Sequence, residues 1–206
     1  MLKNIALALQ RFRNSERGVA AVEFALIVPF LLTLYFGSLE AAALFTVDKR
    51  INSTSATLGD LISQWDPLEV PGVVKVPQTT WNNYLAASTA IMTPYSTTGL
   101  KIVVSLVKVK NDGTTLVLWS KANTGAAKTE NAAYAGFTAS SMMNQVARGG
   151  CIVAAEASYS YRPLLGQVFT TALTLGHTNY FLPRYGSEDT INLWDKSVAD
   201  KTCTTP

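Results

Sequence analysis

The sequence is poor in the residues that carry most enzyme chemistry. It contains a single histidine, His177, and two cysteines, Cys151 and Cys203. A metal site of the usual ligand number cannot be assembled from soft ligands, because His177 has no second histidine and no nearby cysteine. The chain also lacks a nucleophile elbow around any serine and a glycine-rich phosphate loop. We therefore expect no enzymatic activity, no metal and no cofactor.

Charge is scarce and, over most of the chain, balanced. Charged residues make up 15% of the sequence, and the net charge of +3 arises in the first eighteen residues, where four basic residues face Glu16 alone. The 167 residues from Glu40 onward hold 13 basic and 12 acidic residues. No nucleic-acid partner is expected from such a balance. The length and the 48% apolar content of the chain instead predict one domain with a packed core.

A long apolar run separates the basic start from this domain. From Val19 to Leu39, Glu23 is the only charged residue. At about 1.5 Å per residue, a helix of this length crosses a hydrocarbon core of about 30 Å. The run therefore predicts a transmembrane helix over 19–39. Because basic residues favour the cytoplasmic side, residues 1–18 are expected to be a cytoplasmic leader and the rest to be exported.

A cleaved signal peptide is the alternative for this N-terminus. Its apolar region would be shorter, about 7–15 residues, and would end in small residues at the cleavage site. Ala41-Ala42-Ala43 offers such a site, whereas the length of the run and Glu40 at its end count against it. Cleavage at Gly18, before the apolar run, fits the sequence better.

The segment from Arg17 to Leu31 carries a family resemblance. Arg-Gly-Val-Ala-Ala-Val-Glu-Phe-Ala-Leu-Ile-Val-Pro-Phe-Leu resembles the TadE-like proteins, minor pilins of tight-adherence (Flp, type IVb/c) pilus systems. The resemblance is strong over residues 15–65. It is weaker at Tyr159-Ser160-Tyr161-Arg162-Pro163-Leu164, which is similar to a tyrosine-rich strand of such proteins. The chain is much longer than the major Flp pilin, which favours a minor or accessory role.

The resemblance implies a pathway and a set of partners. A prepilin peptidase of the bacterial inner membrane would cut after Gly18, so that Val19 becomes the first residue, and Glu23 and Phe24 would serve processing or assembly. The exported domain would lie in the periplasm, or in a surface pilus used for adhesion. Its partners would be other pilins and pseudopilins and the pilus assembly platform. The competing hypothesis is an unprocessed single-span membrane protein whose exported domain binds an envelope partner; an anchored envelope hydrolase ranks below both.

Glu23 needs a physical explanation whatever the family. A carboxylate at the centre of a membrane helix costs roughly 2.5–3.5 kcal/mol on insertion scales, so a partner is expected. After cleavage, the α-ammonium group of Val19 on a neighbouring subunit could pair with it and set the register of a helix bundle. Alternatively, the side chain sits at the headgroup level and reaches water.

The exported chain predicts an α+β fold. Apolar residues spaced by four and three predict that the helix continues to Trp65 and packs against a partner or against its own domain; the seam is Leu44, Val47, Ile51, Thr54, Leu58, Leu61 and Trp65. Residues 40–66 would be the exported half of this long helix and 67–206 a pilin-like α+β domain. Proline at position 67 ends the helix.

Within 67–206 we expect a small antiparallel sheet of three to five strands with short helices. The expected elements are a helix over 80–92, a hairpin of strands 100–110 and 114–120, a helix over 140–147, a half-buried strand over 151–162, a helix or lid over 164–175 and an edge-like strand over 178–185. Cys151 and Cys203 both lie beyond the membrane segment, where an oxidising compartment permits a disulfide. Two unpaired thiols are the alternative.

Overall fold

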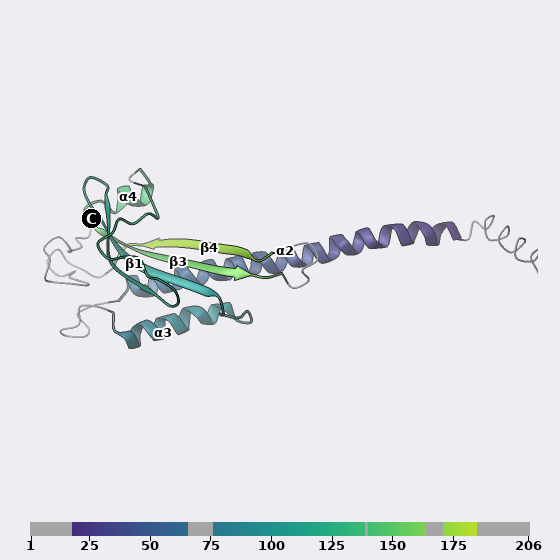
Figure 1. Cartoon of the computed structure of the whole chain (residues 1–206), viewed down its shortest axis with the longest axis horizontal. Coiled ribbons are helices and arrows are strands. Elements are labelled where there is room, and N and C mark those ends of the chain that lie inside the picture. Colours follow the sequence, from purple (N-terminus) through teal and green to yellow (C-terminus); the bar gives the residue numbers. More distant parts are fainter. Residues whose placement is uncertain (1–17, 66–75, 139, 164–170, 185–206) are drawn as a thin grey trace, which may run out of the picture. The chain divides into compact units, whose positions relative to one another are not determined.

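The computed structural model describes residues 18–65, 76–138, 140–163 and 171–184. Its longest element is α2, a helix over Val19–Ser63 of 45 residues (Figure 1). This confirms the predicted continuation of the apolar helix into the rest of the chain. By its internal contacts the chain divides between Leu44 and Phe45. We call the part that contains α2 from Phe45 onward and the sheet the folded unit.

The folded unit is built on a four-stranded sheet in the order β2-β1-β3-β4. Every neighbouring pair is antiparallel, so the predicted α+β class with a small antiparallel sheet is confirmed. The strands are β1 (Leu100–Val109), β2 (Thr115–Ala122), β3 (Cys151–Tyr161) and β4 (Leu173–Phe181). The short helices are α3 (Gln78–Thr89), η3 (Ala90–Met92) and α4 (Met142–Val146).

The β1–β2 hairpin forms where the sequence predicts it. Gly113 has a positive φ of 84°, which a glycine adopts without strain. The Asp112 carboxylate accepts hydrogen bonds from the Thr114 backbone N–H at 2.8 Å and from its hydroxyl at 2.7 Å. The hydroxyl bond is the largest cause of the lowered pKa of Asp112. Local side-chain bonds of this kind explain why a turn can be read from sequence.

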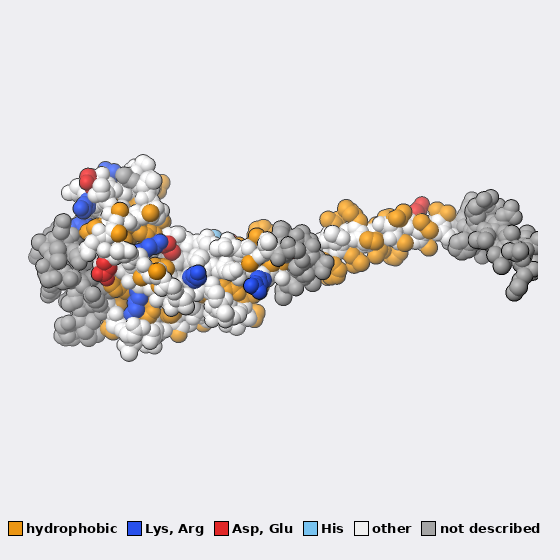
Figure 2. Space-filling view, viewed as in Figure 1, with side chains coloured by type: hydrophobic (Ala, Val, Ile, Leu, Met, Phe, Trp, Pro, Cys, Tyr) orange, Lys and Arg blue, Asp and Glu red, His pale blue; other side chains and the backbone are white. Residues whose placement is uncertain are grey.

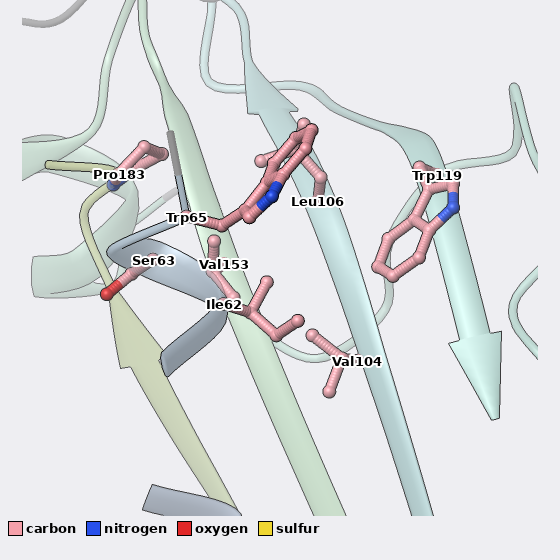
Figure 3. A pocket seen from close by; sticks show the side chains of 8 residues that line it. All are labelled: Ile62, Ser63, Trp65, Val104, Leu106, Trp119, Val153 and Pro183. Carbon is pink, nitrogen blue, oxygen red and sulfur yellow. The ribbon is translucent and has the colours of Figure 1, made fainter. Parts of the chain in front are cut away.

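Helix α2 covers one face of the sheet with the seam that its spacing predicts. Val47, Ile51 and Leu58 are completely buried. At the end of the helix Ile62 is buried, whereas the predicted Leu61 is only half-buried. Figure 3 shows Ile62 and Trp65 beside Val104, Leu106 and Val153 of the sheet, around a cavity of about 10 Å³. The part of the helix from Phe45 onward therefore packs against its own domain.

Gly59 allows the helix to approach the sheet closely. A Cβ atom at this position would lie 2.5 Å from the ring of Phe181 and 2.9 Å from the Cβ of Ala155. The first contact could be relieved by a rotation of the Phe181 ring. The second could not, since the Cβ of Ala155 is fixed by the backbone of β3. The close packing of α2 against β3 and β4 therefore requires a residue without a side chain at position 59.

Polar contacts join α2 to the edge strand β4. The Nε2 atom of His177 lies 2.7 Å from Oδ1 of Asp48. Two residues along β4, the Asn179 amide donates to Oδ1 of Asn52 at 2.9 Å and to the Ser55 hydroxyl at 2.7 Å. Beyond the strand, the Arg184 guanidinium contacts Asp60. In these contacts, residues later in α2 meet residues later in the segment of β4 and Arg184. β4 therefore runs in the same direction as α2.

The opposite face of the sheet carries a second core. Val107, Ile152 and Ala154 are buried there together with Tyr134, and Phe137 and Met143 pack against them. The Tyr134 hydroxyl donates to Oε1 of Glu156 at 2.9 Å. Burial, and then the Glu156 charge, raise the pKa of the Tyr134 hydroxyl. The tyrosine therefore stays a neutral donor in the folded protein.

This second core corrects the prediction for the strand over 151–162. The alternation of its side chains predicts one buried face, but residues 151–155 are buried on both faces. The reason is that α2 covers one side of β3 and the segment around Tyr134 covers the other. Beyond Ala155 the burial becomes mixed, as predicted for a half-buried strand.

The last described strand also differs from its prediction. β4 spans Leu173–Phe181, whereas the sequence predicts an edge strand over 178–185 and a helix or lid over 164–175. The strand Leu173–Phe181 is difficult to predict from the sequence, because it contains polar residues that contact α2. Residues 164–170 and 185 lie outside the described residues.

The close approach at Gly59 generates a stability prediction. An alanine in a helix interior is normally more favourable than glycine by roughly 0.5–1 kcal/mol. At Gly59 we expect the opposite, because overpacking costs typically about 1–3 kcal/mol. Gly59→Ala should therefore lower the melting temperature of the detergent-solubilised chain, at about 2–4 °C per kcal/mol.

Gly37→Ala is the matched control for this prediction. Gly37 lies in the same helix, and a Cβ atom there would meet nothing within 4 Å. Its substitution should leave the melting temperature unchanged or slightly raised. Equal melting temperatures for the two variants would contradict the proposed packing at Gly59.

Candidate functional site

Gly18 stands directly before the first residue of α2. A Cβ atom at Gly18 would meet no other atom within 4 Å, and the residue is exposed. The described structure therefore gives no internal reason for a glycine here. Glycine leaves the backbone unshielded and easily extended, and no described side chain covers the position at Gly18.

Glu23 is exposed, one helical turn after Val19. No hydrogen bond or ion pair joins its carboxylate to another described residue. Phe24, the next residue, is 68% exposed. The structure thus brings Gly18, Val19, Glu23 and Phe24 together on two turns of helix, as the sequence predicts, and leaves the charge without a partner inside the described chain.

The helix around these residues presents apolar side chains to its surroundings. In the apolar window of α2 the mean hydropathy is 2.2 and none of the residues is buried. A core helix of a soluble protein would be largely buried, whereas this part of α2 is exposed (Figure 2). By its length and composition, the helix could cross a membrane. The large exposed residues here are Val19, Val22, Phe24, Leu26, Ile27, Phe30, Leu31, Leu32, Leu34, Tyr35, Phe36 and Leu39.

Two hydroxyl groups inside this stretch are satisfied by the helix itself. The Thr33 hydroxyl donates to the backbone carbonyl of Pro29 at 2.8 Å, and the Ser38 hydroxyl donates to the carbonyl of Tyr35 at 2.7 Å. Such internal bonds are required where no water is available. Glu23 is the one charged side chain between Val19 and Leu39, and no other described residue pairs with it, so its partner must be sought elsewhere.

A family comparison covers the same stretch. The model of the TadE-like protein family matches residues 18–57. The match begins at Gly18 and ends within α2, two residues before Gly59, so the resemblance seen in the sequence is confirmed over this part of the chain. Among the curated proteins and the solved structures, no significant match was found.

His177 is engaged in a contact that ties β4 to α2. Its Nε2 atom faces Asp48, and both side chains are about one third exposed. The contact gives His177 a structural role within the folded unit. No group of three or more histidine, cysteine, aspartate or glutamate side chains among the described residues is arranged to hold a metal ion.

An open groove of about 420 Å³ lies beside the second core, lined among others by Lys101, Glu156, Ser158 and Thr178. Both carboxylate oxygens of Glu156 already have partners. Oε1 of Glu156 accepts from Tyr134 and Oε2 lies 2.9 Å from the Lys128 ammonium. The groove therefore offers no uncommitted carboxylate as a general acid or base.

Sequence reasoning missed the residues that attach α2 to β4. Asp48, Asn52, Ser55 and Gly59 recur at spacings of four, three and four on one side of the helix. A stripe of polar and small residues beside an apolar seam could have been recognised from this spacing. Its partners on β4 could not, because they lie more than 120 residues away in the chain.

Cys151 begins β3, is 1% exposed and is disulfide-bonded. Cys203, the other cysteine of the chain, lies outside the described residues. The pairing of the two stays a prediction for solution measurement.

We expect the full chain to be two hydrogen atoms lighter under non-reducing conditions than after reduction. Closing a loop of about 50 residues contributes up to ~4 kcal/mol in the chain-entropy model, so Cys203→Ser should lower the melting temperature. Thr204→Ser, one residue away, should not. Complete alkylation of both thiols without reductant would rule out the disulfide.

Proposed function

We propose that this protein is a minor pilin or pseudopilin that serves the assembly of a tight-adherence pilus, and that it is not an enzyme. Its N-terminus would lie in the cytoplasm and its folded unit on the exported side of the bacterial inner membrane. The observation that carries the proposal is a coincidence of boundaries. The TadE-like match starts at residue 18, the apolar helix starts at Val19, and Glu23 is the one charge in its first 21 residues.

Processing after Gly18 is the first step of this proposal. The four basic residues of the leader would hold residues 1–18 on the cytoplasmic side, where a prepilin peptidase would reach the bond. The open surroundings of Gly18 support this step. A glycine that its own chain does not need suggests a requirement imposed by the peptidase. The cut would leave a new α-ammonium group on Val19.

Assembly through Glu23 is the second step. A carboxylate in lipid is costly without a partner, and the described chain provides none. In a bundle of subunits, the α-ammonium of Val19 on a neighbour would be a suitable partner. Buried ion pairs rarely add net stability, so the pair would set the register of the helices, while the exposed apolar side chains would supply the contact area.

The two parts of α2 differ in the apolar surface that they leave open to a partner. From Val47 to Leu58 the apolar face is buried against the sheet, so it is not available to a partner helix. From Val19 to Leu39 the apolar side chains are exposed. Contacts with other pilins within the membrane would therefore use the first half of the helix. The same packing suits an unprocessed membrane anchor, which remains the second candidate, and cleavage separates the two.

The processing proposal predicts a new N-terminus. In a cell with a competent prepilin peptidase, N-terminal sequencing of the membrane fraction should find Val19 first. Gly18→Val should keep the full chain, because its branched side chain would shield the scissile bond. Gly37→Val, at another open glycine of α2, should be cut normally. Met1 at the N-terminus of assembled material would favour the anchor.

The assembly proposal predicts a selective defect for Glu23→Val. The variant should insert into the membrane at least as well as the wild type, because a charge is removed. It should nevertheless fail to co-purify with the pilus machinery and should reduce the number of surface fibres. Thr33→Val also replaces a polar group of the same helix with an apolar one, and it should assemble normally. If Glu23→Val assembled as well as Thr33→Val, the carboxylate would have no role.

A further inference from the structure

The groove of about 420 Å³ lies on the face of the sheet that α2 leaves open. The side chain of Ala155 faces Gly59 of α2, and neighbouring residues of a strand point to opposite faces. Glu156 and Ser158, which line the groove, therefore lie on the other face. Tyr134 covers this face as far as Glu156, to which it donates a hydrogen bond. Beyond Glu156, Ser158 is only half-buried, so this part of the face is accessible to a ligand.

A glycine that the described chain does not require lies in the floor of the groove. Gly176 is inside β4, where the pairing with β3 continues without a bulge from Leu173 to Phe181. Its φ is not positive. A Cβ atom at Gly176 would meet only the backbone oxygen of Ala157, at an ordinary contact distance of 3.6 Å. Glycine weakens a strand, and where no bulge accounts for it, it often marks the close approach of a ligand or of another backbone.

Uncommitted polar groups surround this glycine. Lys101, Ser158 and Gly176 form one row across β1, β3 and β4, because Lys101 pairs with Ser158 and Ser158 pairs with Gly176. Thr178 lies two residues further along β4 and also lines the groove. No described residue forms a hydrogen bond or ion pair with the Lys101 ammonium or with the hydroxyls of Ser158 and Thr178. These three groups are available to a ligand that lies over Gly176.

The charge of the groove suits a single carboxylate. Glu156 is paired with Lys128 at 2.9 Å, so its charge is balanced, and Lys101 is the uncommitted charge among the described residues of the lining. A phosphate monoester carries about −1.5 to −2 charges at neutral pH, which is more than one lysine balances. A carboxylate carries one negative charge, and its hydrogen bond with an ammonium is roughly twice as strong as a bond between neutral groups.

The hydroxyl groups favour a saccharide over a peptide. β1 and β3 each pair with a strand on both sides, so a peptide cannot add to their backbone as it would to a free sheet edge. The groups left for a ligand include the side-chain hydroxyls of Ser158 and Thr178, which both donate and accept hydrogen bonds. Sugar hydroxyls do the same, and a sugar ring can lie over the bare backbone at Gly176.

We propose that this groove binds an acidic saccharide. A carboxylate of the sugar would bind the Lys101 ammonium, its hydroxyls would bind Ser158 and Thr178, and its ring would lie over Gly176. This activity goes beyond the proposed role in pilus assembly. All four residues belong to the folded unit, so the site depends neither on processing after Gly18 nor on the membrane.

The test is a titration of the full chain in detergent micelles with digalacturonate, a disaccharide of uronic acids, followed by amide NMR. The amide signals of Ser158 and Gly176 should shift and then saturate. The methyl ester of the same disaccharide keeps the sugar hydroxyls but has no charge. It should bind at least about tenfold more weakly, because the hydrogen bond to a charged group is lost. Triglutamate, an acidic peptide, and inorganic phosphate should bind no more tightly than the ester.

Variants separate the site from the fold. Gly176→Val should abolish the shift at Ser158, because its side chain would fill the floor of the groove, while the melting temperature should not fall, since valine favours strands. Lys101→Gln, at an exposed position, should keep the fold and weaken binding about tenfold. Lys49→Gln is the matched control. Lys49 is also exposed and has no partner among the described residues, but it lies on α2, and its substitution should leave binding unchanged.

Saturable binding of digalacturonate that needs both the Lys101 charge and the space at Gly176 would support the site. Absence of a shift at Ser158, equal binding of the methyl ester, or tighter binding of triglutamate or phosphate would overturn it. So would unchanged binding by Lys101→Gln. Cleavage after Gly18 and fibre assembly are measured separately, so a failure of this titration leaves the proposed function as it stands.

Discussion

A single helix must satisfy two different environments, and the rest of the structure depends on how it does so. Along Val19–Leu39 the side chains of α2 are mostly apolar and exposed, with Glu23 as the one charge, a surface that suits a lipid environment. From Val47 onward the same helix buries one face against a sheet and leaves its other faces polar. The contact at Gly59 makes the second arrangement possible, because it brings the helix within van der Waals distance of β3 and β4.

The two faces of the sheet are covered by different parts of the chain. One face receives α2 through apolar residues at its centre and through polar residues along the edge strand β4, where Asp48 meets His177 and Asn52 meets Asn179. The other face is covered in part by Tyr134 and α4 and stays open around Lys101 and Ser158. Polar attachment lets an edge strand with few buried apolar residues join the unit, and its side chains also fix which residues of helix and strand face each other.

Local chemistry was readable from the sequence, and contacts between distant segments were not. The length of α2, the β1–β2 hairpin and the strand predicted over 151–162 follow from periodicity and turn residues, and each was confirmed. The double burial of residues 151–155 and the extent of β4 depend on partners far away in the chain. Gly18 and Glu23 could be singled out because no contact with another described residue explains them; their roles in processing and assembly remain proposals for the same reason.

The continuity of α2 has a mechanical consequence. No loop separates Leu39 from Val47, so tension applied along the helix in the membrane would pass directly into the folded unit. Because β4 runs in the same direction as α2, the contacts at Asp48, Asn52 and Asp60 would be loaded side by side in shear and would share the force. A subunit pulled by its anchor would resist extraction collectively, whereas contacts arranged to peel would fail one after another.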